Sequence, residues 1–113
     1  MNTKPLGELD ELVLLAIGIL GEDAYAFSIK SCIEDQAKRT LALATVHAAL
    51  YRMEERGLVR SAMGGATATR GGRRKRLFTV TNSGFEALRH TRTVRERMWG
   101  LLGGGLRPAD GLT

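Results

Sequence analysis

The chain has 113 residues, of which 43% are hydrophobic, a length and composition that fit one globular domain and exclude wholesale disorder. Its net charge of +5 is unevenly distributed, because residues 1–37 have a balance of −5 and residues 38–113 a balance of +10. A concentrated basic region attracts polyanions, of which nucleic acid is the commonest and an anionic membrane is the rival.

The cysteine count and the longest apolar run bear on location. Cys32 has no second cysteine with which to form an intramolecular disulfide, so we expect a reducing cytoplasm. The apolar run 12–20 has nine residues, whereas a membrane-spanning helix takes roughly 20. Glu8, Asp10 and Glu11 contradict a signal peptide. We therefore expect a cytoplasmic protein without a membrane span.

Two helices are predicted before residue 40. Residues 9–20 are dense in Leu, Ile and Val without a polar stripe, which indicates a helix that is buried on most sides and ends at Gly21. A turn over residues 21–23 follows. The next helix is predicted to be amphipathic, because apolar residues recur in it at helical spacing: Phe27, Ile29, Ile33 and Ala37.

A third helix is predicted from about Thr45 to Arg56, after a brief extended piece at residues 41–43. Its apolar residues at positions i, i+3, i+4 and i+7 give it one buried face: Val46, Ala49, Leu50 and Met53. Gly57 then ends the helix in a left-handed conformation.

The third helix is also the candidate for reading DNA. In a helix–turn–helix pair, the second helix enters the major groove and reads base edges from its exposed positions. We therefore predict DNA contacts by the outer face, through Thr45, Ala48, Tyr51 and Arg52, with His47 on the flank. An ordinary solvent-exposed face is the alternative interpretation.

Two strands are predicted next, at residues 58–63 and 76–80, joined by a long glycine-rich loop. Residues 70–76 hold five cations and no anion. These like charges repel one another unless a polyanion binds them. We predict a wing that grips DNA phosphates or enters the minor groove through Arg70, Arg73, Arg74 and Lys75. A flexible solvated loop is the alternative.

A fourth helix is predicted from Asn82 to about Leu102, with Thr81 as its N-cap and a glycine run as its stop. Its far end carries an apolar cluster that includes the single tryptophan: Val94, Met98, Trp99, Leu101 and Leu102. Little of the chain is left to cover this cluster, so we predict a homodimer interface. The alternatives are a helix folded back onto its own core and an interfacial membrane helix, which Glu86 and Glu96 disfavour.

The order of three helices, a basic hairpin and one more helix resembles the PadR-like winged-helix transcription regulators over roughly residues 9–102. Residues 45–59, TVHAALYRMEERGLV, are similar to the family's recognition helix and first wing strand. Residues 71–84, GGRRKRLFTVTNSG, are similar to its second wing strand and the start of its last helix. The turn GEDAYA at residues 21–26 also resembles the family. The resemblance implies a homodimer, joined mainly by the last helix, that represses genes by blocking operators.

The chain departs from the family's pattern at two places. Many members have a Tyr-Pro pair where this chain has His47 and Ala48, so a phosphate contact at that point would have to come from His47. The usual His-Gly before the tyrosine of the turn is replaced by Asp23 and Ala24, before Tyr25. The short C-terminal part resembles the subgroup with a single C-terminal helix.

The predicted fold is mainly α with a small β-hairpin. It divides into a winged helix-turn-helix DNA-binding domain over residues 1–81, a C-terminal dimerisation helix over residues 82–102 and a flexible tail over residues 103–113. The predicted function is sequence-specific binding of double-stranded DNA for transcriptional control. We expect a homodimeric repressor on a palindromic operator, and the rival is a winged-helix interaction module that binds an acidic protein.

Other chemistry finds little support in the sequence. There is no nucleophile–base–acid set and no Walker-type loop, so we expect neither an enzyme nor a cofactor. His47 and His90 lie far apart without zinc-ligand spacing, so no metal site is expected. Cys32 is expected to be a small apolar residue. The operator sequence, and whether a small-molecule effector exists, are left open.

Overall fold

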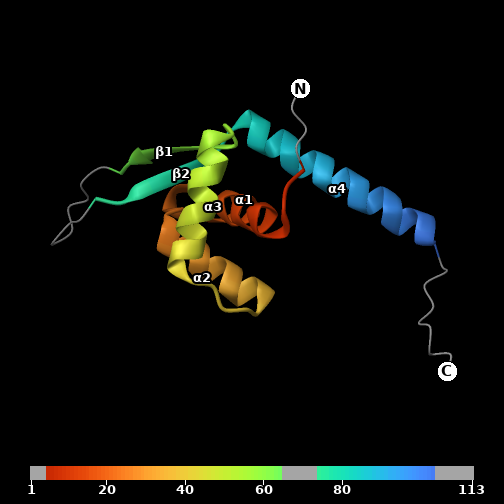
Figure 1. Cartoon of the computed structure of the whole chain (residues 1–113), viewed down its shortest axis with the longest axis horizontal. Coiled ribbons are helices and arrows are strands. Elements are labelled where there is room, and N and C mark those ends of the chain that lie inside the picture. The colour runs from red at the N-terminus through yellow and green to blue at the C-terminus, as the bar shows by residue number, and fades with distance from the viewer. Residues whose placement is uncertain (1–4, 65–73, 104–113) are drawn as a thin grey trace.

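The computed structural model describes residues 5–64 and 74–103, which form four α-helices and one two-stranded antiparallel sheet (Figure 1). The elements in chain order are α1 (Glu8–Leu20), the short 3-10 helix η1 (Gly21–Asp23), α2 (Ala26–Ala37), α3 (Leu43–Glu55), β1 (Val59–Met63), β2 (Arg76–Val80) and α4 (Asn82–Leu102). The predicted mainly helical fold with a small hairpin is confirmed. Most of the predicted loop, residues 65–73, and the predicted tail from residue 104 lie outside the described residues.

One apolar core lies between α1, α2 and α3, and β2 closes it on one side (Figure 1). The buried face predicted for α3 is confirmed by four side chains that are at most 2% exposed: Val46, Ala49, Leu50 and Met53. On β2, Phe78 and Val80 are buried and Thr79 between them is exposed, the alternation of a strand with one face on the core. The core therefore fixes both the orientation of α3 and the face of the hairpin.

The prediction that α1 is buried on most sides is confirmed, and one strip along the helix is exposed. Val13, Leu14 and Ile17 enter the core, but Leu15 and Ile19 are 43% and 70% exposed. α1 contacts α2, α3, β2 and α4, so only the strip that lies between these neighbours is exposed. Within the described part of the chain, this strip leaves the Leu15 and Ile19 side chains exposed.

The exposure of residues at the ends of α2 and the first residue of α3 differ from the prediction. Phe27 is 56% exposed, because it lies two residues before the buried Ile29 and so about 200° around the helix. Ala37, the last residue of α2, is exposed as well. α3 begins at Leu43, two residues earlier than expected, with Ala42 as its N-cap. Leu43 and Ala44 are strong helix formers, which favours this longer first turn.

Gly57 connects the C-terminal end of α3 to the hairpin. Its φ is +78°, so the predicted left-handed end of α3 is confirmed. The Gly57 N–H donates to the Glu54 carbonyl at 3.0 Å and the Leu58 N–H donates to the Met53 carbonyl at 2.9 Å, the pattern of a Schellman motif. Leu58 and Val59 are buried directly afterwards, which fixes the direction in which the hairpin leaves α3.

Thr81 joins the hairpin to α4. Its Oγ1 accepts from the Gly84 N–H at 3.1 Å, which confirms the predicted N-cap, and donates to the Gly57 carbonyl at 2.7 Å. Gly84 is buried, and a Cβ there would overlap the Leu58 carbonyl oxygen and lie 2.7 Å from Cγ1 of Val80. α4 therefore starts in close contact with the base of the hairpin.

Gly84→Ala is expected to lower the free energy of unfolding by about 2 kcal/mol, because backbone at Leu58 must move to admit the methyl group. Gly18→Ala is the matched control, since a Cβ at Gly18 meets nothing within 4 Å and alanine favours a helix. Urea unfolding measures both variants. Equal stability of the two variants would contradict the close approach of α4 to the hairpin.

Candidate nucleic-acid interface

α3 presents one exposed face, which carries all five of its residues predicted to contact DNA: Thr45, His47, Ala48, Tyr51 and Arg52. Ala44 and Ala48 leave the backbone open to close approach, because each has only a methyl group as its side chain. The Tyr51 side chain projects from the same face and is 67% exposed. The structure thus brings the five residues together, and their contact with DNA stays a prediction.

Arg52 has a partner on another helix. Its Nη2 donates to Oδ1 of Asp10 on α1 at 2.7 Å, and the Asp10 side chain is only 11% exposed. On α3 itself only Glu55, at i, i+3, has a spacing from Arg52 at which helix side chains can pair, but the observed partner is Asp10. The Arg52 side chain is 54% exposed and has five N–H donors, so the ion pair leaves donors free to contact DNA.

Glu34 holds the turn that leads into α3. Its carboxylate accepts the backbone N–H of Leu41 at 2.8 Å and the Lys30 ammonium at 3.2 Å. The hydrogen bond from Leu41 and then the one from Lys30 stabilise the charged form, so the pKa of Glu34 lies below its usual value. Since Leu41 is buried in the core, this contact fixes where α3 starts.

The hairpin is attached to the segment before α2. The Phe78 N–H of β2 donates to the Ala24 carbonyl at 2.9 Å, which extends the two-stranded ladder by one further backbone contact. The Lys75 ammonium lies 4.1 Å from the centre of the Tyr25 ring, a cation–π contact. Figure 1 shows the hairpin extending away from the helices on the side opposite to α4. These contacts hold the hairpin against the segment before α2.

The basic residues of the hairpin differ in their surroundings. Arg74 and Lys75 are exposed, and Arg74 Nε donates to the Gly64 carbonyl at 3.3 Å. Arg70 and Arg73, predicted to belong to the same wing, lie outside the described residues. Arg76, which was not among the predicted contacts, is exposed and donates to Oγ of Ser61 at 3.0 Å. The described residues therefore place three adjacent cations at the loop end of the hairpin, where Arg76 pairs with Met63.

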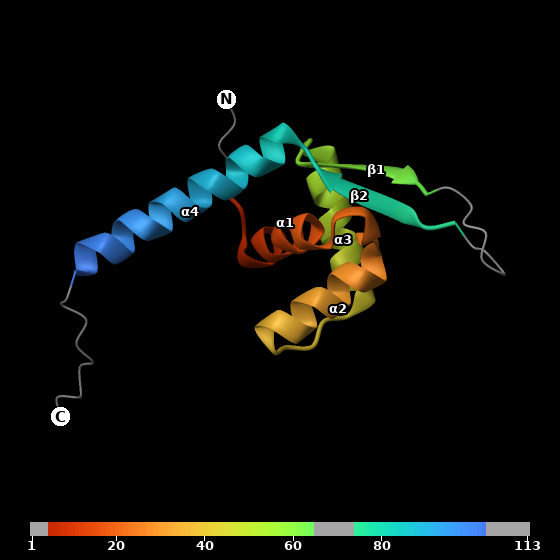
Figure 2. The same ribbon diagram turned by 180° about the vertical axis from the view of Figure 1, so that it is seen from behind.

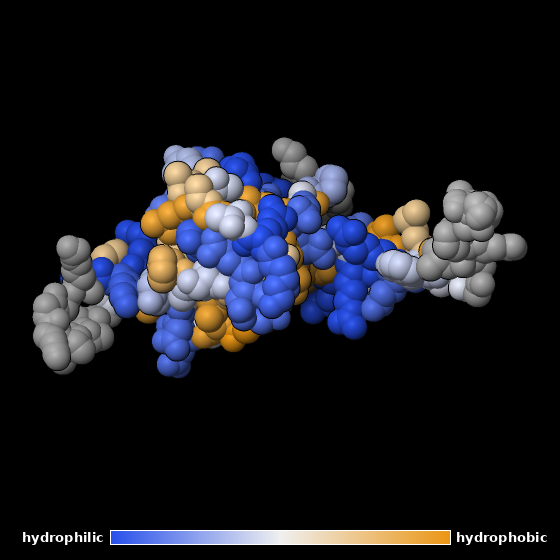
Figure 3. All heavy atoms as spheres, turned by 90° about the horizontal axis from the view of Figure 1, so that it is seen from below, coloured by the Kyte–Doolittle hydropathy of each residue, from blue (hydrophilic) through white to orange (hydrophobic). Residues whose placement is uncertain are grey.

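The far end of α4 exposes its predicted apolar cluster. Met98 and Trp99 are 64% and 65% exposed, and Leu101 is 81% exposed. Leu102 is also exposed, whereas Val94 is half-buried. Figure 2 shows α4 running out from the helices, and Figure 3 shows apolar side chains near its far end. Nothing in the described part of the chain covers this cluster.

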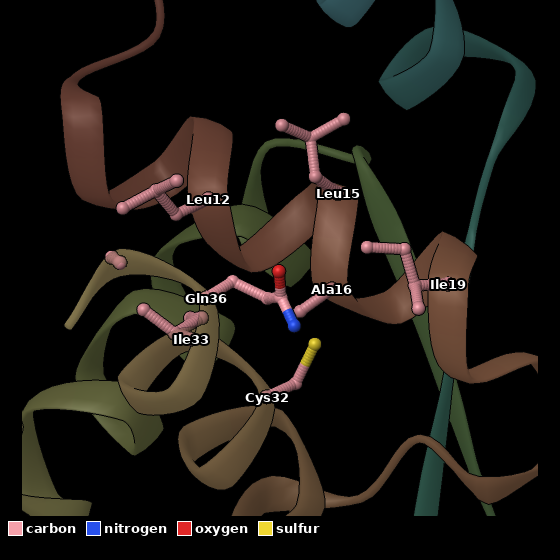
Figure 4. A pocket seen from close by; sticks show the side chains of 8 residues that line it. Leu12, Leu15, Ala16, Ile19, Cys32, Ile33 and Gln36 are labelled. Atoms are coloured by element: carbon pink, nitrogen blue, oxygen red, sulfur yellow. The ribbon is translucent and has the colours of Figure 1, made fainter.

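A second uncovered apolar surface is a pocket of about 240 Å³ between α1 and α2 (Figure 4). Its lining consists of Leu12, Leu15, Ala16, Ile19, Cys32, Ile33, Gln36 and Ala37. Cys32 is half-buried there with its sulfur directed into the pocket, next to the Gln36 amide (Figure 4). The pocket holds no ionisable carboxylate or amine, so it suits apolar contact.

Metal ligands and membrane-spanning helices are both absent from the described residues. No group of three or more His, Cys, Asp or Glu in residues 5–64 and 74–103 is arranged to hold a metal ion. No helix within the same ranges is long and apolar enough to cross a membrane.

Sequence reasoning missed the residues that support the interface rather than form it. Asp10 and Tyr25 contact Arg52 and Lys75 across long separations, and no local pattern marks such pairs. The Lys30–Glu34 pair has i, i+4 spacing and was visible in the sequence, but its link to the turn before α3 was not.

Comparison with protein-family models found no match, and comparison with curated proteins found none either. Solved structures do match. A PadR family transcription regulator from Clostridium difficile R20291 has a TM-score of 0.66 and 27% identity, over 89% of this chain and 100% of that one. A PadR-like transcriptional regulator from Bacillus cereus has a TM-score of 0.65 and 18% identity, over 85% and 92%. Bacillus subtilis PadR, in complex with operator DNA, has a TM-score of 0.59 and 17% identity, over 76% and 47%.

Glu34→Ala is expected to lower the free energy of unfolding at neutral pH, because the Leu41 N–H loses its acceptor. A carboxyl whose pKa is lowered on folding stabilises the protein above its ordinary pKa, and this contribution disappears as the pH falls through the lowered pKa. The difference between wild type and variant should therefore shrink from about pH 5 to pH 3.

Urea unfolding at several pH values measures this difference. Asp35→Ala is the control, because it removes the neighbouring exposed carboxylate of α2 and leaves the Leu41 contact in place. A Glu34 difference that stays constant down to about pH 3 would show that the turn does not depend on the ionised carboxylate.

Proposed function

We propose that this chain, which has the PadR-like winged-helix fold, is a DNA-binding transcription regulator that acts as a homodimeric repressor on a palindromic operator. The observation that carries the proposal is the exposed face of α3 together with three adjacent cations at the loop end of the hairpin, Arg74, Lys75 and Arg76. The fold matches support it, because their proteins are transcription regulators and one of them is in complex with operator DNA. The proposed place of action is the cytoplasm.

The proposed roles of the residues of α3 and of the hairpin follow from their side-chain chemistry. Thr45, Ala48, Tyr51 and Arg52 read base edges in the major groove, with His47 at its border. Arg70, Arg73, Arg74 and Lys75 bind phosphates or enter the minor groove, and we add Arg76 from its exposure on β2. A winged-helix module that binds an acidic protein is the rival, and the polar character of Thr45 and Arg52 favours DNA.

The homodimer is proposed from two uncovered apolar surfaces of one chain. One is the α4 cluster, in which Met98 and Trp99 are about two-thirds exposed, and the other is the α1 side with Leu15 and Ile19. In a two-fold dimer each surface of one copy meets its complement on the other copy, so both can be buried in one interface. We therefore propose residues 82–102 as the dimerisation helix and residues 1–81 as the DNA-binding domain.

Selection of bound sequences from a random pool of double-stranded DNA tests the function directly. The expected result is a palindromic motif whose half-sites are centred about 34–36 Å apart, one turn of the double helix. Thr45→Ala combined with Tyr51→Ala should change the preferred bases within each half-site. Retention of bound DNA without any enriched motif would exclude sequence-specific regulation.

Met98→Glu combined with Trp99→Glu is expected to produce monomers, because two carboxylates cannot be buried in an apolar interface without partners. Sedimentation velocity measures the oligomeric state. Arg89→Glu is the control, since it adds negative charge about 140° around α4 from Val94. A double variant that stays dimeric would place the interface elsewhere.

The basic residues of the hairpin lead to a separate prediction about how the affinity for DNA depends on salt. Arg74→Gln combined with Lys75→Gln should flatten the slope of log affinity against log salt by about 0.9 for each phosphate that the variant no longer neutralises. Arg92→Gln on α4 removes a cation far from the hairpin and should leave the slope unchanged. If the hairpin variant and the control show the same slope, the hairpin does not contact DNA.

A further inference from the structure

The first turn of α1 carries three carboxylates, and each forms an ion pair with an arginine from a different part of the chain. The three pairs are Glu8 with Arg39 at 3.0 Å, Asp10 with Arg52 at 2.7 Å, and Glu11 with Arg95 at 3.0 Å. The arginines belong to the turn before α3, to α3 itself and to α4, respectively. One helical turn is therefore linked electrostatically to every element of the proposed function except the hairpin.

The three pairs differ in burial. The Asp10 and Glu11 side chains are 11% and 19% exposed, whereas the Glu8 side chain is 72% exposed. A carboxylate that is largely removed from water depends strongly on its charged partner, because separation leaves it poorly solvated. The positive end of the helix dipole favours carboxylates in this turn as well. Asp10 and Glu11 therefore form the two pairs that restrain geometry most.

These two pairs connect α3 to α4 through α1. Arg52 is on the helix proposed to read DNA, and Arg95 is on the helix proposed to form the dimer. α4 has 21 residues and is about 31 Å long, so a tilt of about 10° displaces one end by about 5 Å. That displacement exceeds the rise of one base pair, about 3.4 Å.

We propose that the acidic first turn of α1 is a positioning site that sets the half-site spacing which the dimer accepts. Asp10 holds α3 and Glu11 holds α4, so the angle between the reading helix and the dimer helix has one preferred value. This inference rests on the proposed function, because spacing has a meaning only for a dimer bound to two half-sites. It gives Glu11 and Arg95 a role in specificity for half-site spacing, although neither residue lies on the exposed face of α3 that is proposed to read DNA.

The test uses the palindrome selected by the wild-type dimer and versions with one or two base pairs added or removed between the half-sites. Glu11→Gln and Arg95→Gln should each lower the affinity ratio between the preferred and the altered spacing by about fivefold, because a dimer contains two copies of the pair. The double variant should show no larger reduction than either single one, since both substitutions break the same ion pair. Affinity for an isolated half-site should stay unchanged.

Glu8→Gln is the matched control. It removes a carboxylate from the same turn, but its exposed partner Arg39 does not belong to α4, so spacing discrimination should stay as in the wild type. Thermal unfolding followed by circular dichroism establishes that each variant is folded. Arg95→Gln tests the same ion pair from its more exposed side if Glu11→Gln does not fold.

The outcomes separate the two proposals. A wild type without preference for any palindrome overturns the proposed function and this inference with it. A wild type that prefers one palindrome, with discrimination unchanged in Glu11→Gln and Arg95→Gln, overturns the inference alone. An equal reduction of affinity at every spacing, or an equal effect of Glu8→Gln, also overturns it, because a general loss of stability then explains the change.

Discussion

The burial of Val46, Leu50 and Met53 determines what α3 can present outside the chain. These side chains are at most 2% exposed, and a helix with one face held in a core must turn its opposite face to solvent. Gly57 then ends α3 at the core, and the hairpin leaves from there to contact the segment before α2. The exposed face of α3 and the direction of the hairpin are thus consequences of one packing constraint.

Features set by local sequence could be predicted well. The 3.6-residue period of α3, the left-handed Gly57 and the Thr81 cap each depend on a few neighbouring residues, and all three are confirmed. The alternation of Phe78 and Val80 on β2 was predictable for the same reason. The fold class followed because these local signals agree with one another along the chain.

Features set by contacts between distant residues could not be predicted. Arg52 and Asp10 are 42 positions apart, so no local pattern in the sequence marks them as partners. The exposed strip of α1 could not be predicted, because periodicity does not reveal which neighbours surround a helix. Leu15 and Ile19 stay exposed in one chain, and the proposed second copy gives their hydrophobic character a physical reason.

The central claim is that α3 lies in the major groove of two half-sites. Directed DNA cleavage tests it most directly: Cys32→Ala removes the native thiol, and Ala48→Cys or Thr93→Cys then carries a tethered iron chelate. We predict cuts from position 48 in two clusters about 10 base pairs apart, and a different pattern from position 93 on α4. Identical patterns from both positions, or none above free chelate, would contradict the claim.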